Sequence, residues 1–109
     1  GVPVDAVESS GQTALMFSAR TGHSKCVRSL IDAGAHVNGA SDDGWTSLML
    51  ACKKGDSTSA RFLLDAGAEA NLSAHNGATA LMTAAESGHA GCVRLIIDVG
   101  VAVDSARKG

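Results

Sequence analysis

Two short motifs in the sequence place a histidine three residues before a cysteine, a spacing that suits a metal site on a helix. His23 precedes Cys26, and His89 precedes Cys92. Residues three apart share one face of a helix, and imidazole nitrogen and thiolate sulfur are preferred zinc ligands. A complete site would need both pairs, with the four ligand atoms within about 2.3 Å of the metal.

The same residues are candidates for nucleophilic catalysis, because a cysteine beside a histidine base is a known arrangement. No third group that would orient such a base stands out in the sequence. Each of the two histidines follows a glycine that we expect to end a helix, which gives both a structural role. The chain also contains neither a GxxxxGK[ST] loop nor a strand followed by GxGxxG, so no phosphate-binding loop is predicted.

An internal repeat decides between these possibilities. Residues 11–38 align without gaps with residues 44–71 and 77–104, a period of 33 residues. The two histidine–cysteine pairs occupy the same position two repeats apart. Stacked helices lie about 8–10 Å from each other, so about 20 Å should separate the pairs, too far for one zinc ion. We therefore expect no metal, no cofactor and no enzyme activity.

The repeat is marked by eight positions that are identical in all three copies. In the first copy these are Gly11, Thr13, Leu15, Met16, Gly22, Arg28, Asp32 and Gly34. The pair formed by Arg28 and Asp32 has the i, i+4 spacing of a surface ion pair on a helix, worth a few tenths of a kcal/mol.

Each copy is predicted to form a helix, a turn, a second helix and an extended loop. Thr13 and its equivalents are suited to cap a helix of about eight residues, which Gly22, Gly55 and Gly88 should end. Apolar residues at i, i+3, i+4 spacing predict a second helix, which Gly34, Gly67 and Gly100 should end in the left-handed conformation. The segment 34–44 is rich in turn formers and is predicted to form a β-turn finger, with Val37 pointing inward.

The period, the GxTxLM pattern and the closing DAGAxVN resemble the ankyrin repeat over essentially the whole chain. The family usually has Thr-Pro-Leu-His where this chain has TALM, TSLM and TALM. Met16, Met49 and Met82 replace that histidine, so we expect the packing to remain and the polar network between repeats to be lost. The resemblance implies an all-α helical solenoid of helix-turn-helix repeats with β-turn fingers.

Residues 1–109 are interpreted as one ankyrin repeat domain. Residues 1–7 match the tail of a preceding repeat, the three repeats span about 8–40, 41–73 and 74–106, and residues 107–109 start a following one. The first and last copies keep apolar residues where terminal repeats are normally polar. We expect the chain to be part of a longer array in a larger protein, and to be monomeric.

Composition restricts the class of partner. The chain of 109 residues is 45% hydrophobic with a net charge of -2, and it contains neither a long apolar stretch nor a basic field. We expect no membrane segment and no nucleic-acid binding. Three cysteines without CxxC spacing argue for a reducing, intracellular compartment, cytoplasmic or nuclear, and we expect Cys26, Cys52 and Cys92 to be buried.

The function implied by the resemblance is binding of another protein along the concave face made by fingers and first helices. In each repeat, this implicates the two residues before the finger glycine, the one after it, and the two at the end of the first helix. They are Ser9, Ser10, Gln12, Arg20 and Thr21; Asp42, Asp43, Trp45, Lys53 and Lys54; and His75, Asn76, Ala78, Glu86 and Ser87. The alternative is a structural spacer in a longer array, with no partner of its own.

Trp45 is the strongest candidate among these residues, because tryptophan and arginine dominate binding hot spots. Its equivalents are Gln12 and Ala78, so the fold does not require a ring there; the alternative is that Trp45 only packs on its neighbours. Lys53, Lys54 and Arg20 beside the acidic Asp42 and Asp43 indicate a partner of mixed charge.

Asn38 and Asn71 resemble the asparagine that is hydroxylated in some animal ankyrin repeats. The alternative is that each asparagine tolerates a tight turn and caps it locally.

Overall fold

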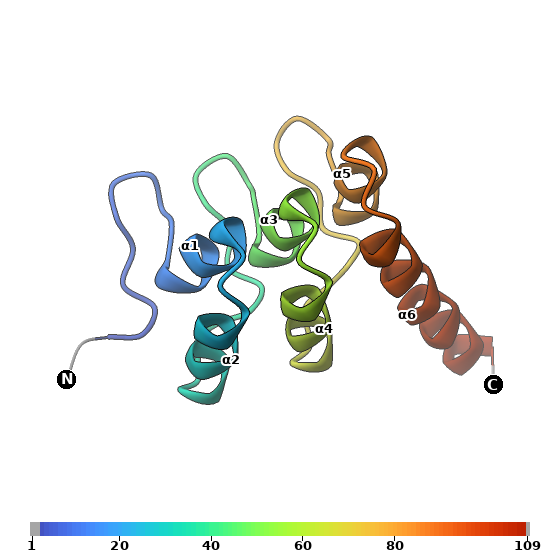
Figure 1. Ribbon diagram of the computed structural model, residues 1–109, viewed down its shortest axis with the longest axis horizontal. Coiled ribbons are helices and arrows are strands. Elements are labelled where there is room, and N and C mark those ends of the chain that lie inside the picture. The colour runs from blue at the N-terminus through green and yellow to red at the C-terminus, as the bar shows by residue number, and fades with distance from the viewer. Residues whose placement is uncertain (1–2, 109) are drawn as a thin grey trace.

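Six α-helices in three pairs make up the chain, and no strand is present in the part of it that the structure describes (Figure 1). The computed structural model describes the backbone of residues 3–108 and the side chains of residues 3–100. The helices are α1 (Ala14–Thr21), α2 (Ser24–Asp32), α3 (Ser47–Lys54), α4 (Ser57–Asp65), α5 (Ala80–Glu86) and α6 (Ala90–Lys108). None of the described helices is both long and apolar enough to span a membrane.

The first helix of each pair begins at the predicted threonine. The hydroxyl oxygens of Thr13, Thr46 and Thr79 accept hydrogen bonds from backbone N–H groups three residues ahead, at 3.2–3.3 Å. This bond satisfies one of the free N–H groups at a helix start. At the other end, Gly22 and Gly55 adopt φ values of 79° and 83° and terminate α1 and α3. The sequence therefore specifies both ends of these short helices.

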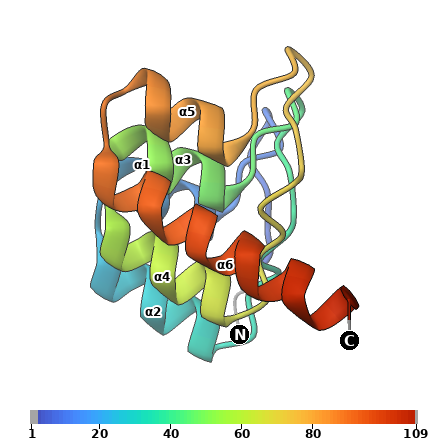
Figure 2. The ribbon, with the colours of Figure 1, turned by 90° about the vertical axis from the view of Figure 1, so that its right-hand side faces the viewer.

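The helices stack in two layers, α1 with α3 and α5, and α2 with α4 and α6 (Figure 2). Leu15 and Leu48 are each only 1% exposed, and Ala60 and Leu63 are fully buried between neighbouring pairs. Helices of eight or nine residues are marginally stable alone in water. Packing between repeats supplies the stability that each helix lacks.

The extended loops form fingers to one side of the helical layers (Figure 2). The second and third fingers are closed by isolated antiparallel bridges, Ala40 with Thr46 and Ser73 with Thr79, and in the first the Glu8 N–H donates to Gln12 O at 3.0 Å. Neighbouring finger tips are also joined, because the Asp42 N–H donates to Ser10 O and the His75 N–H donates to Asp43 O, both at 3.0 Å. The predicted fingers are thus present, and they form one connected row.

Asn38 connects two repeats, and the interpretation that it caps its own turn is wrong. Its Nδ2 donates to Gly67 O at 3.1 Å, and its Oδ1 accepts from the Glu69 N–H at 2.8 Å. One repeat earlier, Asp5 Oδ1 accepts from the His36 N–H at 2.8 Å. A short polar side chain at this position therefore fastens the loop of the next repeat.

The prediction that Gly100 ends a helix is also wrong, because α6 continues from Ala90 to Lys108. Gly34 and Gly67 do adopt positive φ, at 92° and 99°. The loops that follow them lead into fingers closed by β-bridges. Residues 101–108 form no such bridge within the described chain, and an α-helix satisfies their backbone groups internally.

Two predictions about buried side chains fail at the ends of the stack. Met16 and Met49 are 1% exposed as expected, but Met82 is 58% exposed, because no further helix pair covers α5 among the described residues. Cys52 and Cys92 are buried, whereas Cys26 is exposed. Burial of each position depends on the neighbouring repeat, which a single copy of the motif does not reveal.

Candidate partner-binding surface

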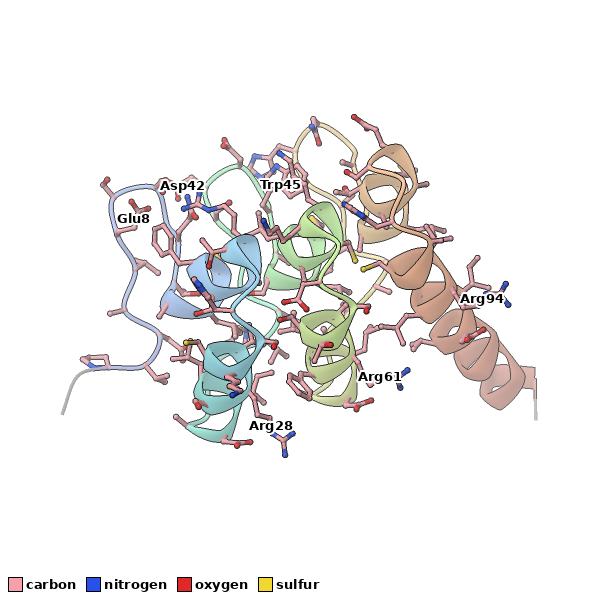
Figure 3. The ribbon with its side chains drawn as sticks, viewed as in Figure 1. Glu8, Arg28, Asp42, Trp45, Arg61 and Arg94 are labelled. Atoms are coloured by element: carbon pink, nitrogen blue, oxygen red, sulfur yellow. The ribbon has the colours of Figure 1, made fainter. Side chains whose placement is uncertain are left out.

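The predicted contact residues lie on the surface made by the finger tips and the outer side of the first helices, which we call the finger–helix face. Most of them are exposed: Ser9, Arg20, Thr21, Asp42, Asp43, Lys53, Lys54, His75, Asn76, Glu86 and Ser87. Four are half-buried: Ser10, Gln12, Trp45 and Ala78. In Figure 3, Glu8, Asp42 and Trp45 lie on the finger side, whereas Arg28, Arg61 and Arg94 project from the second helices.

An aromatic ring that the sequence analysis missed lies on this face. Phe17 in α1 is 37% exposed, and the Arg20 guanidinium carbon lies 4.7 Å from its ring centroid. A cation at this distance over a ring is attracted by the negative face of the π system. The equivalents of Phe17 are Leu50 and Thr83. The comparison between copies that singled out Trp45 would therefore also have found Phe17.

Trp45 makes the matching arrangement in the second repeat. Lys53 Nζ lies 5.5 Å from the centroid of its ring. The ring is half-buried and packs against the core, and the backbone of Trp45 is held by Ser41, whose N–H donates to Trp45 O at 2.9 Å. Trp45 therefore packs on the fold and still keeps part of its ring at the surface.

Acidic residues occupy the finger edge of the face. The Glu8 carboxylate is engaged within its own loop, where it accepts from the N–H and hydroxyl of Ser10 and, at 3.3 Å, from the Gln12 N–H. Asp42 and Asp43 are exposed and form no ion pair with any side chain that the structure describes. The first two repeats thus present carboxylates on the finger edge of the face and cations at the ends of the first helices.

The third repeat presents a different surface. Glu86 stands where the first two repeats have Arg20 and Lys53, and Thr83 and Ala78 replace the rings. Its finger carries His75 and Asn76 in place of acids. The face is therefore uneven along the stack, with its aromatic and cationic groups in the first two repeats.

Each histidine of the two His–Cys motifs has a polar contact, His23 within its own turn and His89 with the preceding repeat. His23 Nδ1 lies 2.8 Å from Thr21 Oγ1, and His89 Nε2 lies 3.2 Å from Lys53 O. Among the described side chains, no three of the His, Cys, Asp and Glu type converge as metal ligands. The arrangement offers a structural role for each histidine at a turn.

The buried cysteines have strongly perturbed acidity. Burial, with a smaller contribution from the neighbouring Cys92, raises the pKa of Cys52 from 9.0 to about 12. Burial also raises the pKa of Cys92. Because the thiolate is the reactive form, neither cysteine is suited to act as a nucleophile near neutral pH.

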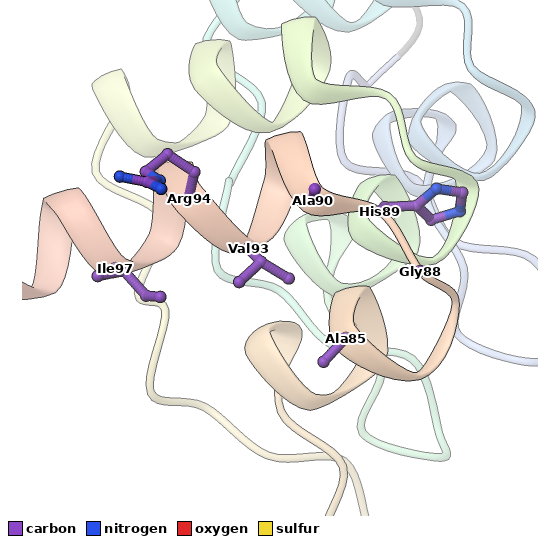
Figure 4. A pocket seen from close by; sticks show the side chains of 7 residues that line it. All are labelled: Ala85, Gly88, His89, Ala90, Val93, Arg94 and Ile97. Atoms are coloured by element: carbon purple, nitrogen blue, oxygen red, sulfur yellow. The ribbon is translucent and has the colours of Figure 1, made fainter.

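A hollow of about 590 Å³ lies at the open side of the third repeat (Figure 4). It is lined by Ala85, Gly88, His89, Ala90, Val93, Arg94 and Ile97. The equivalents of Ala85 are Ala19 and Cys52, which are fully buried by the next repeat. Few polar groups converge here, since the His89 ring points away from Val93 and Ile97 (Figure 4). The hollow is the inter-repeat packing surface of the last repeat.

Comparison with known families covers nearly the whole chain. Residues 1–74 match a family model described as ankyrin repeats in three copies, and residues 76–108 match a model of the single ankyrin repeat. The comparison with curated proteins gave no match.

Proposed function

Because the chain belongs to the ankyrin repeat family, whose repeats are generally protein–protein interaction modules, we propose that it binds a partner protein through the finger–helix face. The observation that carries this proposal is the pair of rings on that face. Phe17 and Trp45 are replaced by smaller residues in the other copies, so the fold does not require them. Tryptophan and arginine are among the side chains that most often dominate protein interfaces.

The connected fingers support the same proposal. Hydrogen bonds join finger tips to each other, and Asp5 and Asn38 join the bases of neighbouring loops. A surface that is already ordered loses little conformational entropy when a partner binds.

We further propose that the chain is not an enzyme, needs no cofactor, and acts as a monomeric unit in an intracellular compartment, cytoplasmic or nuclear. The high pKa values of Cys52 and Cys92 support the first point. The three free cysteines, one of them exposed, support a reducing compartment.

Site-specific photo-crosslinking tests the proposed face. A benzophenone amino acid is placed at Thr21, on the face, or at Arg61, an exposed residue of α4, and the protein is irradiated in cells that express it. We expect protein adducts from position 21 and none of the same mass from position 61. Adducts from position 61 alone would place the partner on the second helices, and no adduct at either position would favour a structural spacer.

A further inference from the structure

Two cations on the finger–helix face occupy the same position of successive repeats, and each lies over an aromatic ring. Arg20 lies over Phe17 at 4.7 Å, and Lys53 lies over Trp45 at 5.5 Å. A side chain resting on a ring has fewer rotamers to lose on binding, while its N–H groups remain available as donors. Both cations are therefore arranged to receive an acceptor.

Neither cation has an acidic partner of its own. The only ion pair among the described side chains joins Arg28 and Asp32, at 3.4 Å, in α2. The helix dipole favours a cation at the end of α1 and α3, but α5 ends with Glu86, so the fold does not require one. The dipole also gives no reason for a ring beneath each cation.

We infer that the partner of this face is an acidic peptide segment that presents two carboxylates, one to Arg20 and one to Lys53, with an apolar side chain directed to the rings. This inference rests on the proposed function and adds the chemistry of the partner. Charged hydrogen bonds to guanidinium and ammonium groups are the strongest polar contacts available to such a segment.

The stacking of the repeats sets the spacing of the two carboxylates. Neighbouring packed helices lie about 8–10 Å apart, and α1 packs directly on α3. This distance corresponds to about three residues of an extended chain at roughly 3.1 Å per residue, or about five to seven residues of a helix at 1.5 Å per residue, of which a separation of seven keeps both side chains on one helix face. The acidic residues should occur in pairs with one of these spacings.

The finger edge restricts the partner further. Asp42 and Asp43 are exposed and unpaired in the described chain, so they repel negative charge on that side. A polyanion such as a nucleic acid carries charge along its whole length and would meet this repulsion. A peptide that carries its acids on one edge avoids it.

A phage-displayed library of random 16-residue peptides is the probe for this inference. It is selected on the wild-type chain, and single peptides are then measured on an R20S/K53S variant and on a K25S/R61S control. Lys25 and Arg61 are exposed residues of α2 and α4, so both variants lose the same charge. Thermal midpoints of all three proteins establish that they are folded.

We expect selected peptides to be enriched in Asp or Glu pairs three or seven residues apart. Their affinity should fall at least about tenfold on the R20S/K53S variant, since a charged hydrogen bond contributes about this factor, and should stay within about twofold on the control. Added salt should weaken binding to the wild type more than to the R20S/K53S variant.

Three results would overturn the inference. In the first, the selected peptides lack acidic pairs and bind wild type and R20S/K53S equally, but lose affinity on a W45A variant. This result leaves the proposed function standing and contradicts the acidic partner. In the second, affinity falls as much on the K25S/R61S control as on R20S/K53S, which shows an effect of net charge alone. In the third, affinity is unchanged by every substitution on the face, W45A included, which removes the proposed function as well.

Discussion

Asn38 is the side chain that joins two repeats most directly, with one hydrogen bond given and one received. Each such bond contributes about 0.5–1.5 kcal/mol net, so Asn38→Ala should lower the free energy of unfolding by about 1–3 kcal/mol. Urea denaturation followed by circular dichroism measures this loss.

Asn76→Ala is the matched control for this substitution. Asn76 Oδ1 accepts only from the Ala78 N–H in its own finger, at 3.1 Å, so its loss should cost less than that of Asn38. If the two substitutions cost the same, the bonds between repeats contribute nothing beyond local turn stability.

The acidity of Cys52 predicts how stability changes at high pH. Its folded pKa of about 12 lies above its ordinary value of 9.0, so the unfolded chain loses the thiol proton first as pH rises. The stabilising effect of the neutral thiol is complete below pH 9 and is lost between pH 9 and 12, with a slope of about 1.4 kcal/mol per pH unit. Unfolding measured from pH 8 to 10.5 should show a shallower decline for Cys52→Ala than for wild type; parallel declines would show that the thiol ionises freely in the folded state.

Trp45→Ala should weaken partner binding more than it weakens the fold. Because the ring is half-buried and packs on the core, we expect a stability loss of about 1–2 kcal/mol. Truncating a binding anchor typically costs about 2 kcal/mol or more, roughly a thirtyfold loss of affinity. Calorimetric titration with the partner that photo-crosslinking identifies measures binding, and Lys25→Ala is the control. Unchanged affinity with a lower thermal midpoint would show that the ring only packs.

At the scale of the element, helix α3 differs from α5 in having a neighbour on both sides. It packs on α1 and α5, and its Leu48 is 1% exposed, whereas the equivalent Leu81 of α5 is 37% exposed. Leu48→Ala should therefore cost about 2–5 kcal/mol, and Leu81→Ala less than about 2 kcal/mol. Chemical denaturation measures the free energy of unfolding of the two variants, which change the same residue type at the same repeat position in different repeats. Equal costs would mean that the open side of α5 is as well packed as the middle of the stack.

The ends and faces of the first five helices could be predicted from the sequence because their determinants are local. Thr13 caps a helix through an N–H three residues away, and Gly22 ends it through its own backbone conformation. The exposure of Cys26 and Met82 could not be predicted this way, because each is covered or left open by a different repeat. The prediction that Gly100 ends α6 fails for the same reason, because the loop conformation that would follow it depends on a neighbouring finger.

The finger–helix face was only partly predictable. Position within the repeat placed Arg20 and Lys53 on the surface, as the structure describes. The stacking of Arg20 on Phe17 depends on side-chain directions in three dimensions. Spacing in the sequence does not specify them.

At the scale of the whole molecule, the third repeat leaves an apolar side open. Met82 is 58% and Ile97 46% exposed, and Ile97 lines the hollow together with Val93. Replacing residues 101–109 with a repeat whose far side is polar should cover this surface and raise the thermal midpoint by about 4–8 °C for each kcal/mol gained. Scanning calorimetry of both proteins measures the change. An unchanged midpoint would contradict the expectation that the chain is an excerpt of a longer array.

The contacts that join the repeats are unequal across the width of the stack. Finger tips are connected by one backbone hydrogen bond per junction, whereas the helices are joined by fully buried side chains such as Leu63 and Ala60. Spreading the fingers would break these bonds and the Asp5 and Asn38 bonds at the finger bases, while separating the helical layers must expose the core to water. We therefore expect any change in the curvature of the solenoid to begin at the finger side, because separating the helical layers would expose more apolar surface.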